Sequence, residues 1–308
     1  MAIRALRTLA RILYPLQGTG LPRIAERIRR GTAARLLANQ QPADFWIQDF
    51  MGRLQFCCDL RDHMGSQIFF RGAYSFDQLA LIRTLLPQPC VFVDIGANQG
   101  EFSVFVASLC KDSQVLAFEP TSQMRARLKA NVKANEFDNV RVFAVGLSNE
   151  AREDVPIYGG HSTFEDGTRH SGLPTIFAIS QRDQLLETIS LRTLDDVWRT
   201  ELSFGRIDLM KIDVEGAELH VLQGARQTIA EHRPFIIFES SRESSAAAGY
   251  STSDLYQLLY SWGYELQAIG AGGALAELDS STSFCNVLGM PREKVSDVNS
   301  KLGARELS

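Results

Sequence analysis

Apolar positions follow two spacings along the chain, and the two alternate in a regular order from residue 91 onward. Short apolar runs, of which residues 91–95 are the first, are typical of buried strands. Between the runs, apolar side chains recur three or four residues apart, as at Phe102, Phe105 and Leu109, and so mark one face of a helix. Strands that alternate with helices predict an α/β fold, a doubly wound and mostly parallel sheet with helices on both faces.

The predicted elements follow from this rhythm. Strands are expected at residues 91–95, 114–118, 140–145, 207–212 and 234–239, with a terminal antiparallel hairpin at 264–269 and 284–290. Helices are expected at residues 76–86, 102–109, 121–132, 219–229 and 253–262. Residues 147–206 are rich in Gly, Ser, Thr and charge, and predict a hairpin insertion with a short helix near residues 194–198.

The rest of the chain differs from this central region. Residues 1–40 predict short amphipathic helices broken at Pro15, Gly18, Gly20 and Pro22. Residues 53–72 alternate enough to suggest a hairpin. We therefore divide the chain into a basic helical arm (1–40), an N-terminal hairpin extension (41–75), a sheet domain (76–290) and a polar tail (291–308) expected to be frayed.

Charge separates the arm from the body. The arm holds eight arginines against one acid, Glu26, and so carries +7; since the whole chain carries -4, the remainder carries -11. An acidic body disfavours nucleic acid as its substrate, whereas the arm is suited to a weak contact with an anionic membrane surface. A basic helix packed on the body, without any membrane contact, is the alternative.

The chain has five cysteines but no CxxC pair, and no apolar run long enough to span a membrane. We therefore expect a cytoplasmic protein; a cytoplasmic protein in peripheral contact with the membrane is the alternative.

A glycine-containing loop, Asp94-x-Gly96-x-x-x-Gly100, joins the first of these strands to its helix. Gly96 permits a tight turn and a close approach of a ligand to the backbone, and Gly100 lets the helix begin beside that ligand. A dinucleotide fingerprint requires a middle glycine where this chain has Asn98, and Asp94 would repel a pyrophosphate. Glu119 ends the second strand, where a carboxylate can accept hydrogen bonds from both ribose hydroxyls. These features predict a nucleoside that carries a positive amino group.

Four acids and a lysine surround the end of the fourth strand, within Asp208-Leu-Met-Lys-Ile-Asp-Val-Glu-Gly-Ala-Glu218. Lys211 and Asp213 point the same way if the strand is regular, and Glu215 lies on the turn beyond them. A lysine in an apolar strand needs a buried partner. The segment therefore predicts an acid–base cluster beside the nucleoside, although a salt-bridged helix start accounts well for Glu218.

Several of these segments also carry a family resemblance. They are Val93-Asp-Ile-Gly-Ala-Asn-x-Gly100, Phe118-Glu-Pro120, Asn131, Ala144-Val-Gly-Leu-Ser-Asn149 and Lys211-Ile-Asp-Val-Glu-Gly-Ala-Glu218. With them, residues 75–290 resemble the FkbM-type methyltransferases. The resemblance implies a seven-stranded class I methyltransferase fold, S-adenosylmethionine as methyl donor, and often hydroxyl methylation on sugars, glycolipids or macrolides.

The resemblance also implies which residues hold the cofactor. The loop would hold its methionine end, Glu119 its ribose, and Asp213 would lie near the sulfonium. The predicted cofactor-binding residues are Asp94, Gly96, Ala97, Asn98, Gly100, Glu119, Pro120, Ala144, Val145 and Asp213. Many class I enzymes have an acid after the third strand for the adenine amine, whereas this chain has Ala144-Val145.

We therefore expect an S-adenosylmethionine-dependent O-methyltransferase acting on a hydroxyl of a small molecule, sugar or glycolipid. Asp213 or Glu215 is the candidate base, with Lys211 setting the local charge, and His161 in the insertion is a second candidate base. The other four histidines are expected at the surface. No metal site is predicted, and a divalent metal between Asp213 and Glu239 is an alternative. Two other functions stay open: an NAD(P)-dependent oxidoreductase, and a non-catalytic nucleoside-binding module recruited through the arm.

Overall fold

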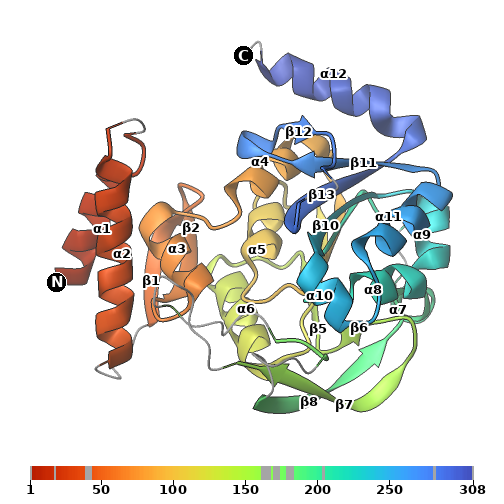
Figure 1. The fold of residues 1–308 in the computed structure, drawn as a ribbon, viewed down its shortest axis with the longest axis horizontal. Coiled ribbons are helices and arrows are strands. Elements are labelled where there is room, and N and C mark those ends of the chain that lie inside the picture. The colour runs from red at the N-terminus through yellow and green to blue at the C-terminus, as the bar shows by residue number, and fades with distance from the viewer. Residues whose placement is uncertain are drawn as a thin grey trace.

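A twisted central sheet organises the computed structural model of the chain (Figure 1). The structure describes residues 2–16, 19–38, 44–160, 168, 174–177, 184–202, 205–279 and 282–306. Eight strands form the sheet, in the order β12-β11-β13-β10-β9-β3-β4-β5. They are β3 (Val91–Ile95), β4 (Gln114–Phe118), β5 (Val140–Phe143), β9 (Leu209–Ile212), β10 (Phe235–Ser241), β11 (Tyr264–Ile269), β12 (Leu275–Ala276) and β13 (Phe284–Pro291).

The sheet has a parallel part and an antiparallel part. The strands from β10 to β5 run parallel, while β13 runs antiparallel to both β10 and β11. The order reverses at β3, whose neighbours are β4 and β9, so the switch point lies where β3 ends. The predicted doubly wound, seven-stranded sheet is confirmed, with β12 as an additional two-residue edge strand.

Helices cover both faces because neighbouring strand residues point to opposite sides. Phe92 packs in a core with α4 (Phe76–Leu85), α5 (Glu101–Ala107) and α6 (Ser122–Ala134). Val93 packs in a second core on the opposite face. Its helices are α7 (Leu194–Glu201), α8 (Glu218–Gly224), α9 (Arg226–His232) and α11 (Thr252–Ser261). The remaining helices of this part are α10 (Arg242–Ala247) and the short turns η1 (Ala271–Gly273) and η2 (Arg292–Lys294).

The N-terminal residues form a separate layer beside the sheet (Figure 1). It consists of α1 (Ala2–Leu13), α2 (Leu21–Ala38), the hairpin β1 (Asp44–Phe50) with β2 (Leu54–Asp59), and α3 (His63–Arg71). The hairpin predicted for residues 53–72 is therefore wrong for its second strand, because residues 63–71 form the helix α3. Asp62 caps a helix there by accepting a hydrogen bond from Gly65 N, and this helix buries the apolar run at residues 68–70.

The tail predicted to be frayed is a helix, α12 (Val295–Glu306). Val298 is fully buried, and Lys301 Nζ donates a hydrogen bond to Leu85 O at the end of α4. Apolar contacts of Val295, Val298 and Leu302 and one capping cation therefore hold a segment whose composition is polar. None of the described helices is long and apolar enough to cross a membrane.

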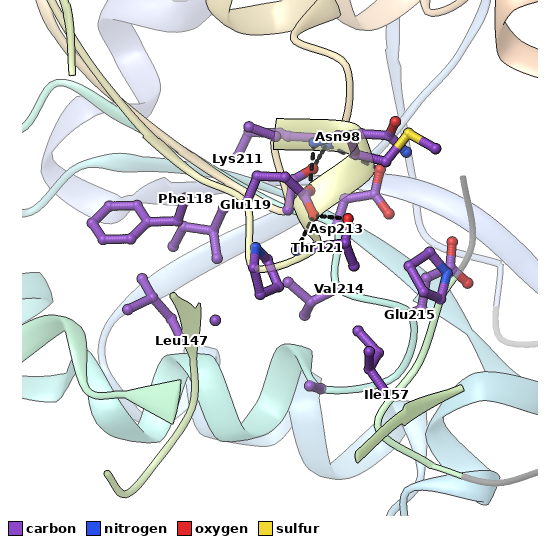
Figure 2. A pocket seen from close by; sticks show the side chains of 18 of the residues that line it. Asn98, Phe118, Glu119, Thr121, Leu147, Ile157, Lys211, Asp213, Val214 and Glu215 are labelled. Atoms are coloured by element: carbon purple, nitrogen blue, oxygen red, sulfur yellow. Dashed lines mark hydrogen bonds and ion pairs between the residues drawn. The ribbon is translucent and has the colours of Figure 1, made fainter. Parts of the chain in front are cut away.

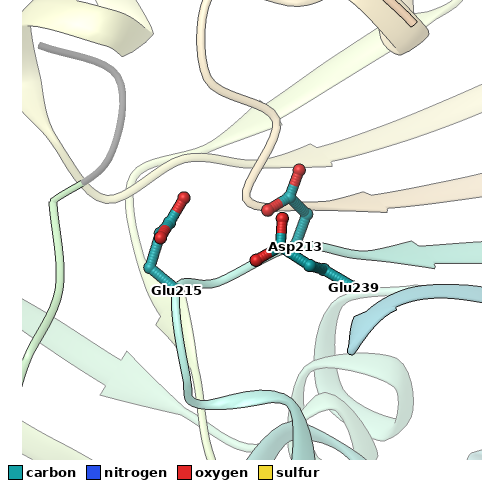
Figure 3. A group of neighbouring side chains, drawn as sticks. All are labelled: Asp213, Glu215 and Glu239. Carbon is teal, nitrogen blue, oxygen red and sulfur yellow. The ribbon is translucent and has the colours of Figure 1, made fainter. Parts of the chain in front are cut away.

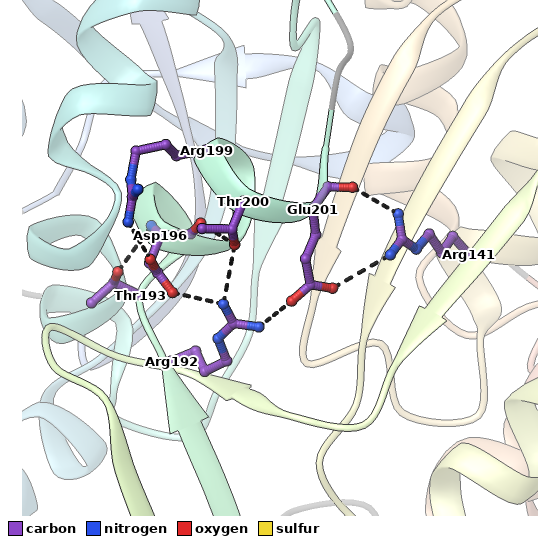
Figure 4. Close-up of polar contacts among 7 residues, drawn as sticks. All are labelled: Arg141, Arg192, Thr193, Asp196, Arg199, Thr200 and Glu201. Carbon is purple, nitrogen blue, oxygen red and sulfur yellow. Dashed lines mark hydrogen bonds and ion pairs between the residues drawn. The ribbon is translucent and has the colours of Figure 1, made fainter.

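The insertion forms a small second sheet, β6-β8-β7, of β6 (Gly146–Leu147), β7 (Arg152–Gly159) and β8 (Gln184–Arg192). A polar network fastens it to the body (Figure 4). Arg192 at the end of β8 pairs with Asp196, at 2.6 Å, and with Glu201, both on α7. Arg141 on β5 donates to the Glu201 carbonyl at 3.0 Å. The second sheet is thus held against α7 and, through Glu201, linked to β5.

Candidate functional site

The loop after β3 sits against the segment that follows β9. Gly96 N and Ala97 N both donate to Phe118 O at 3.0 Å, which turns the chain sharply across the end of β4. Gly96 has φ +76°, and a Cβ at this position would lie 1.8 Å from Asp213 O. Only glycine fits this turn, because any side chain would occupy the space of the neighbouring backbone.

Glu119 is held in one orientation at the end of β4 (Figure 2). Its Oε2 accepts from Asn98 N at 2.8 Å, and its Oε1 accepts from Thr121 N at 2.8 Å and Thr121 Oγ1 at 2.6 Å. The residue is 5% exposed, and burial raises the pKa of its carboxyl group. Glu119 also lines a pocket, together with the loop after β3 and the segment after β9. A carboxylate there can accept further hydrogen bonds from a ligand.

Lys211 lies buried between two carboxylates. Its Nζ is 3.0 Å from Asp213 Oδ2 and 4.0 Å from Asp94 Oδ1, and it also lies over the ring of Phe102. Burial alone would lower the pKa of Lys211, but the attraction of Asp213 and Asp94 raises it overall. The lysine therefore stays charged, and Asp94 and Asp213 are the partners that a lysine in an apolar strand needs.

Three carboxylates meet at the ends of β9 and β10 (Figure 3). One oxygen from each of Asp213, Glu215 and Glu239 lies within 4.8 Å of the other two. Burial first, and then the charges of Asp213 and Glu215, raise the pKa of Glu239 well above its ordinary value. Glu239 therefore takes up a proton more readily than an ordinary glutamate does.

The other side of the pocket comes from the N-terminal layer, which the sequence did not point to. His63 and Tyr74 line it, with their rings edge to face at 5.6 Å. His63 Nδ1 lies 3.1 Å from Thr168 Oγ1, so this half-buried histidine is not the surface residue expected from the sequence. Glu101 Oε1 accepts hydrogen bonds from Tyr74 N at 2.6 Å and Ser75 N at 3.1 Å. Glu101 therefore joins this layer to the start of α5.

Most of the predicted site residues line the pocket. These are Gly96, Ala97, Asn98, Glu119, Pro120, Lys211, Asp213 and Glu215. Asp94 and Gly100 instead lie behind the wall: Asp94 is fully buried and accepts a hydrogen bond from Ser103 Oγ at 2.6 Å. Ala144 and Val145 are not among the lining residues, and Gly146 and Leu147 line the wall just beyond them. His161 lies outside the described residues.

The pocket suits a cationic nucleoside. One wall is apolar, with Phe118, Leu147 and Ile157 (Figure 2), as an adenine ring requires. Glu119 stands beside it for ribose hydroxyls. The deeper part is acidic: Glu101 lines it, and its Oε2 is buried without a hydrogen-bond partner among the described residues. Asp94 Oδ1, which also lacks such a partner, lies behind the wall at 4.0 Å from Lys211 Nζ. These groups match the sulfonium and ammonium charges of S-adenosylmethionine, so the residues fit this cofactor.

Removing the charge of Glu119 should weaken nucleoside binding. We expect E119Q to bind S-adenosylhomocysteine about 10- to 100-fold more weakly, because hydrogen bonds to a charged acceptor contribute more than those to an amide. Isothermal titration calorimetry measures the change. E243Q, at an exposed glutamate on α10, is the control. Equal affinities in the two variants would show that Glu119 does not contact the ligand.

The crowding of carboxylates predicts a pH effect on stability. Because the pKa of Glu239 is higher in the folded chain than in the unfolded one, the folded state binds more protons between the two values, and stability falls as pH rises through that window. E239Q should therefore unfold with a free energy at least about 1 kcal/mol higher than the wild type at neutral pH. The difference should vanish below about pH 4, where Glu239 is protonated in both states. Urea titrations with EDTA present test this; a constant difference across pH would contradict it.

Comparison with known proteins places this site in a family. The model of the "Methyltransferase FkbM domain" matches residues 94–266, from the acid that begins the glycine loop to β11. Those residues include Asp94, Glu119, Lys211, Asp213 and Glu215. The match covers more than half of the chain.

Individual relatives are more distant. The chain is 32% identical over 233 residues to the AMB antimetabolite synthetase AmbE of Pseudomonas aeruginosa, which covers 67% of this chain but only 11% of that protein. It is 33% identical to methyltransferase sdnD of Sordaria araneosa, covering 45% of this chain and 61% of sdnD. The 2-O-methyltransferase NoeI of Sinorhizobium fredii is 29% identical, over 56% of this chain and 67% of NoeI. The chain thus spans less than two thirds of the first two relatives.

Among solved structures, the FkbM methyltransferase of Methylobacillus flagellatus aligns with 86% of this chain and 60% of its own, at 18% identity and a TM-score of 0.43. The family match, rather than this structural likeness, carries the assignment. The chain belongs to the FkbM methyltransferase domain family, and S-adenosylmethionine is its cofactor.

Proposed function

We propose that this methyltransferase methylates a hydroxyl group of a sugar, glycolipid or other small molecule. The observation that carries the proposal is the cluster of Asp213, Glu215 and Glu239 at the ligand edge of the sheet. An alcohol loses its proton as it accepts a methyl group, and carboxylates at this position can take that proton and hold neighbouring hydroxyls. The relative NoeI is a 2-O-methyltransferase, which agrees with an oxygen acceptor.

S-adenosylmethionine, when bound, supplies an activated methyl group. The work left to the protein is to orient the acceptor, exclude water and accept a proton. We assign the proton to Asp213: its side chain is 35% exposed, and Lys211 holds one of its oxygens at 3.0 Å. Glu215 and Glu239 then serve to bind acceptor hydroxyls.

His63 and Tyr74 are the aromatic groups on the acceptor side of this pocket. We assign them to positioning the acceptor, because a ring edge and a phenol can contact a sugar face and its hydroxyls together. His161 stays a second candidate for the base. The small sheet β6-β8-β7 contributes Ile157, Ile189 and Leu191 to the lining, so it helps to exclude water.

The proposal is tested with S-adenosylmethionine that carries a ¹³C-labelled methyl group. The purified chain is incubated with sugars, glycolipids and, for comparison, primary amines, and the carbon chemical shift of the product separates an O-methyl from an N-methyl group. We expect O-methyl products only. Methylation confined to the amines would overturn the choice of acceptor while leaving the family assignment intact.

The two alternatives from the sequence give different results in a thermal-shift panel. S-adenosylmethionine and S-adenosylhomocysteine should each raise the Tm, because ligands that bind only the folded state stabilise it. NAD and NADP should not, since the loop has Asn98 where a dinucleotide site needs glycine. Stabilisation by S-adenosylmethionine without turnover of any acceptor would favour the binding module.

A further inference from the structure

The apolar residues of α1 are only partly covered by the rest of the chain. Ala10 is fully buried, and Leu6 and Leu13 pack with it against the core of the N-terminal layer. Leu9 and Ile12, by contrast, are 45% and 60% exposed. A surface helix ordinarily presents polar residues to water, so an exposed aliphatic face needs a partner.

Two more exposed apolar residues belong to the end of α1 and the start of α2. Leu16, just beyond α1, is 42% exposed, and Ile24 in the first turns of α2 is 47% exposed. With Leu9 and Ile12 they form what we call the aliphatic strip. These four make up a large share of the exposed large hydrophobic side chains described for the whole chain, so exposure of this kind is concentrated on α1 and α2.

Arginines accompany the aliphatic strip. Arg4 on α1 and Arg23, Arg27 and Arg35 on α2 are exposed, and within the described chain no carboxylate lies within 4 Å of any of them. Glu26, the single acid of residues 1–40, is already paired with Arg29 and Arg30. The exposed cations therefore have no local counter-charge.

The buried sides of α1 and α2 are bonded to the rest of the N-terminal layer, so the fold keeps their other sides exposed. Arg7 and Arg11 both pair with Asp49 on β1, and Arg7 Nε donates to Phe69 O at 2.6 Å. Arg29, which is 1% exposed, donates to Ser66 Oγ at 3.1 Å. These contacts clamp α1 and α2 onto the layer beneath (Figure 1), whereas Leu9, Ile12 and the four arginines named above are exposed.

We propose that α1 and α2 dock the protein onto an anionic phospholipid surface. Aliphatic side chains interleaved with arginines match both parts of such a surface, the acyl boundary and the anionic headgroups. A nucleic acid would use the arginines but not Leu9 and Ile12. A second copy, arm against arm, would bring the exposed arginines of two copies together, which like-charge repulsion opposes. The inference is independent of the proposed function.

The test is flotation of the full chain with vesicles of phosphatidylcholine, alone or mixed with phosphatidylglycerol. We expect binding to the mixed vesicles that is at least about tenfold stronger than to phosphatidylcholine alone, and that is weakened by salt. R23Q/R27Q should lower the partition coefficient at low salt by about fivefold for each arginine. L9Q/I12Q should lower it about tenfold at low and high salt alike.

Matched controls change the same residue types elsewhere. L185Q/L186Q replaces two exposed leucines of β8, and R226Q/R292Q replaces two exposed arginines of the body. Both should bind like the wild type, and circular dichroism shows whether each variant is folded. Equal binding to both vesicle types, no binding to either, or equal losses in the controls would overturn the proposal. So would a dimer that L9Q/I12Q dissociates in the absence of vesicle binding.

Discussion

D213N is expected to lower kcat for methyl transfer by about 10³-fold, because it removes the carboxylate that we assign to the acceptor proton. Asparagine keeps the size of the side chain and cannot act as the base. The affinity for S-adenosylhomocysteine should fall by no more than about tenfold, since one neutral hydrogen-bonding group replaces a charged one. Release of S-adenosylhomocysteine gives kcat, and calorimetry gives the affinity.

The same substitution at an exposed aspartate, D138N, is the control for D213N. Because D213N also leaves Lys211 with a weaker counter-charge at 4.0 Å, its Tm is measured alongside. A folded D213N protein that keeps full turnover would exclude Asp213 as the base and favour Glu215 or His161. A loss of turnover that matches the loss of cofactor affinity would assign Asp213 to binding alone.

G96A is expected to abolish cofactor binding and to lower the free energy of unfolding by about 4 kcal/mol or more, if the variant folds. The added methyl group would lie 1.8 Å from Asp213 O, in a backbone conformation that also disfavours alanine. Relief requires that the loop and the segment after β9 separate. That movement would displace Asp213 and Asn98 together.

The variant G249A separates the steric clash of the added methyl group from the cost of the left-handed backbone. Gly249 also has positive φ, +84°, but a Cβ there would meet nothing within 4 Å. We expect G249A to lose only about 1–2 kcal/mol, the cost of the left-handed backbone alone, and to bind S-adenosylhomocysteine normally. Equal losses of stability in G96A and G249A, measured by urea unfolding, would contradict the steric argument.

The sheet was predictable because its signal is local. Each parallel strand is buried on both faces, so residues 91–95 and 114–118 are short apolar runs with clear boundaries. The helix α12 and the helical state of residues 63–71 were not predictable in this way. Their stability depends on contacts with residues far away in the sequence, such as that of Lys301 with Leu85. The pattern of apolar residues within the segment does not indicate such contacts.

The candidate site likewise has one part that the sequence predicts and one part that only the folded structure reveals. Gly96, Glu119, Lys211 and Asp213 stand at strand ends, and all parallel strands of a sheet end at one edge, so their convergence followed from the sequence. His63 and Tyr74 belong to the N-terminal layer, and only the folded chain brings them to that edge. The sequence signal that could have pointed to this layer was Glu101, an acid at the start of α5 that needs a partner if it is buried.

The place of β13 has a consequence for synthesis on the ribosome. This strand lies between β10 and β11, although both precede it in the chain. Every cofactor-facing side chain named above is made before residues 284–291, yet β10 then still has an open edge that can pair wrongly. We expect a nascent chain arrested before Phe284 to depend on chaperones and to bind no S-adenosylhomocysteine, so that cofactor capture waits for the last strand.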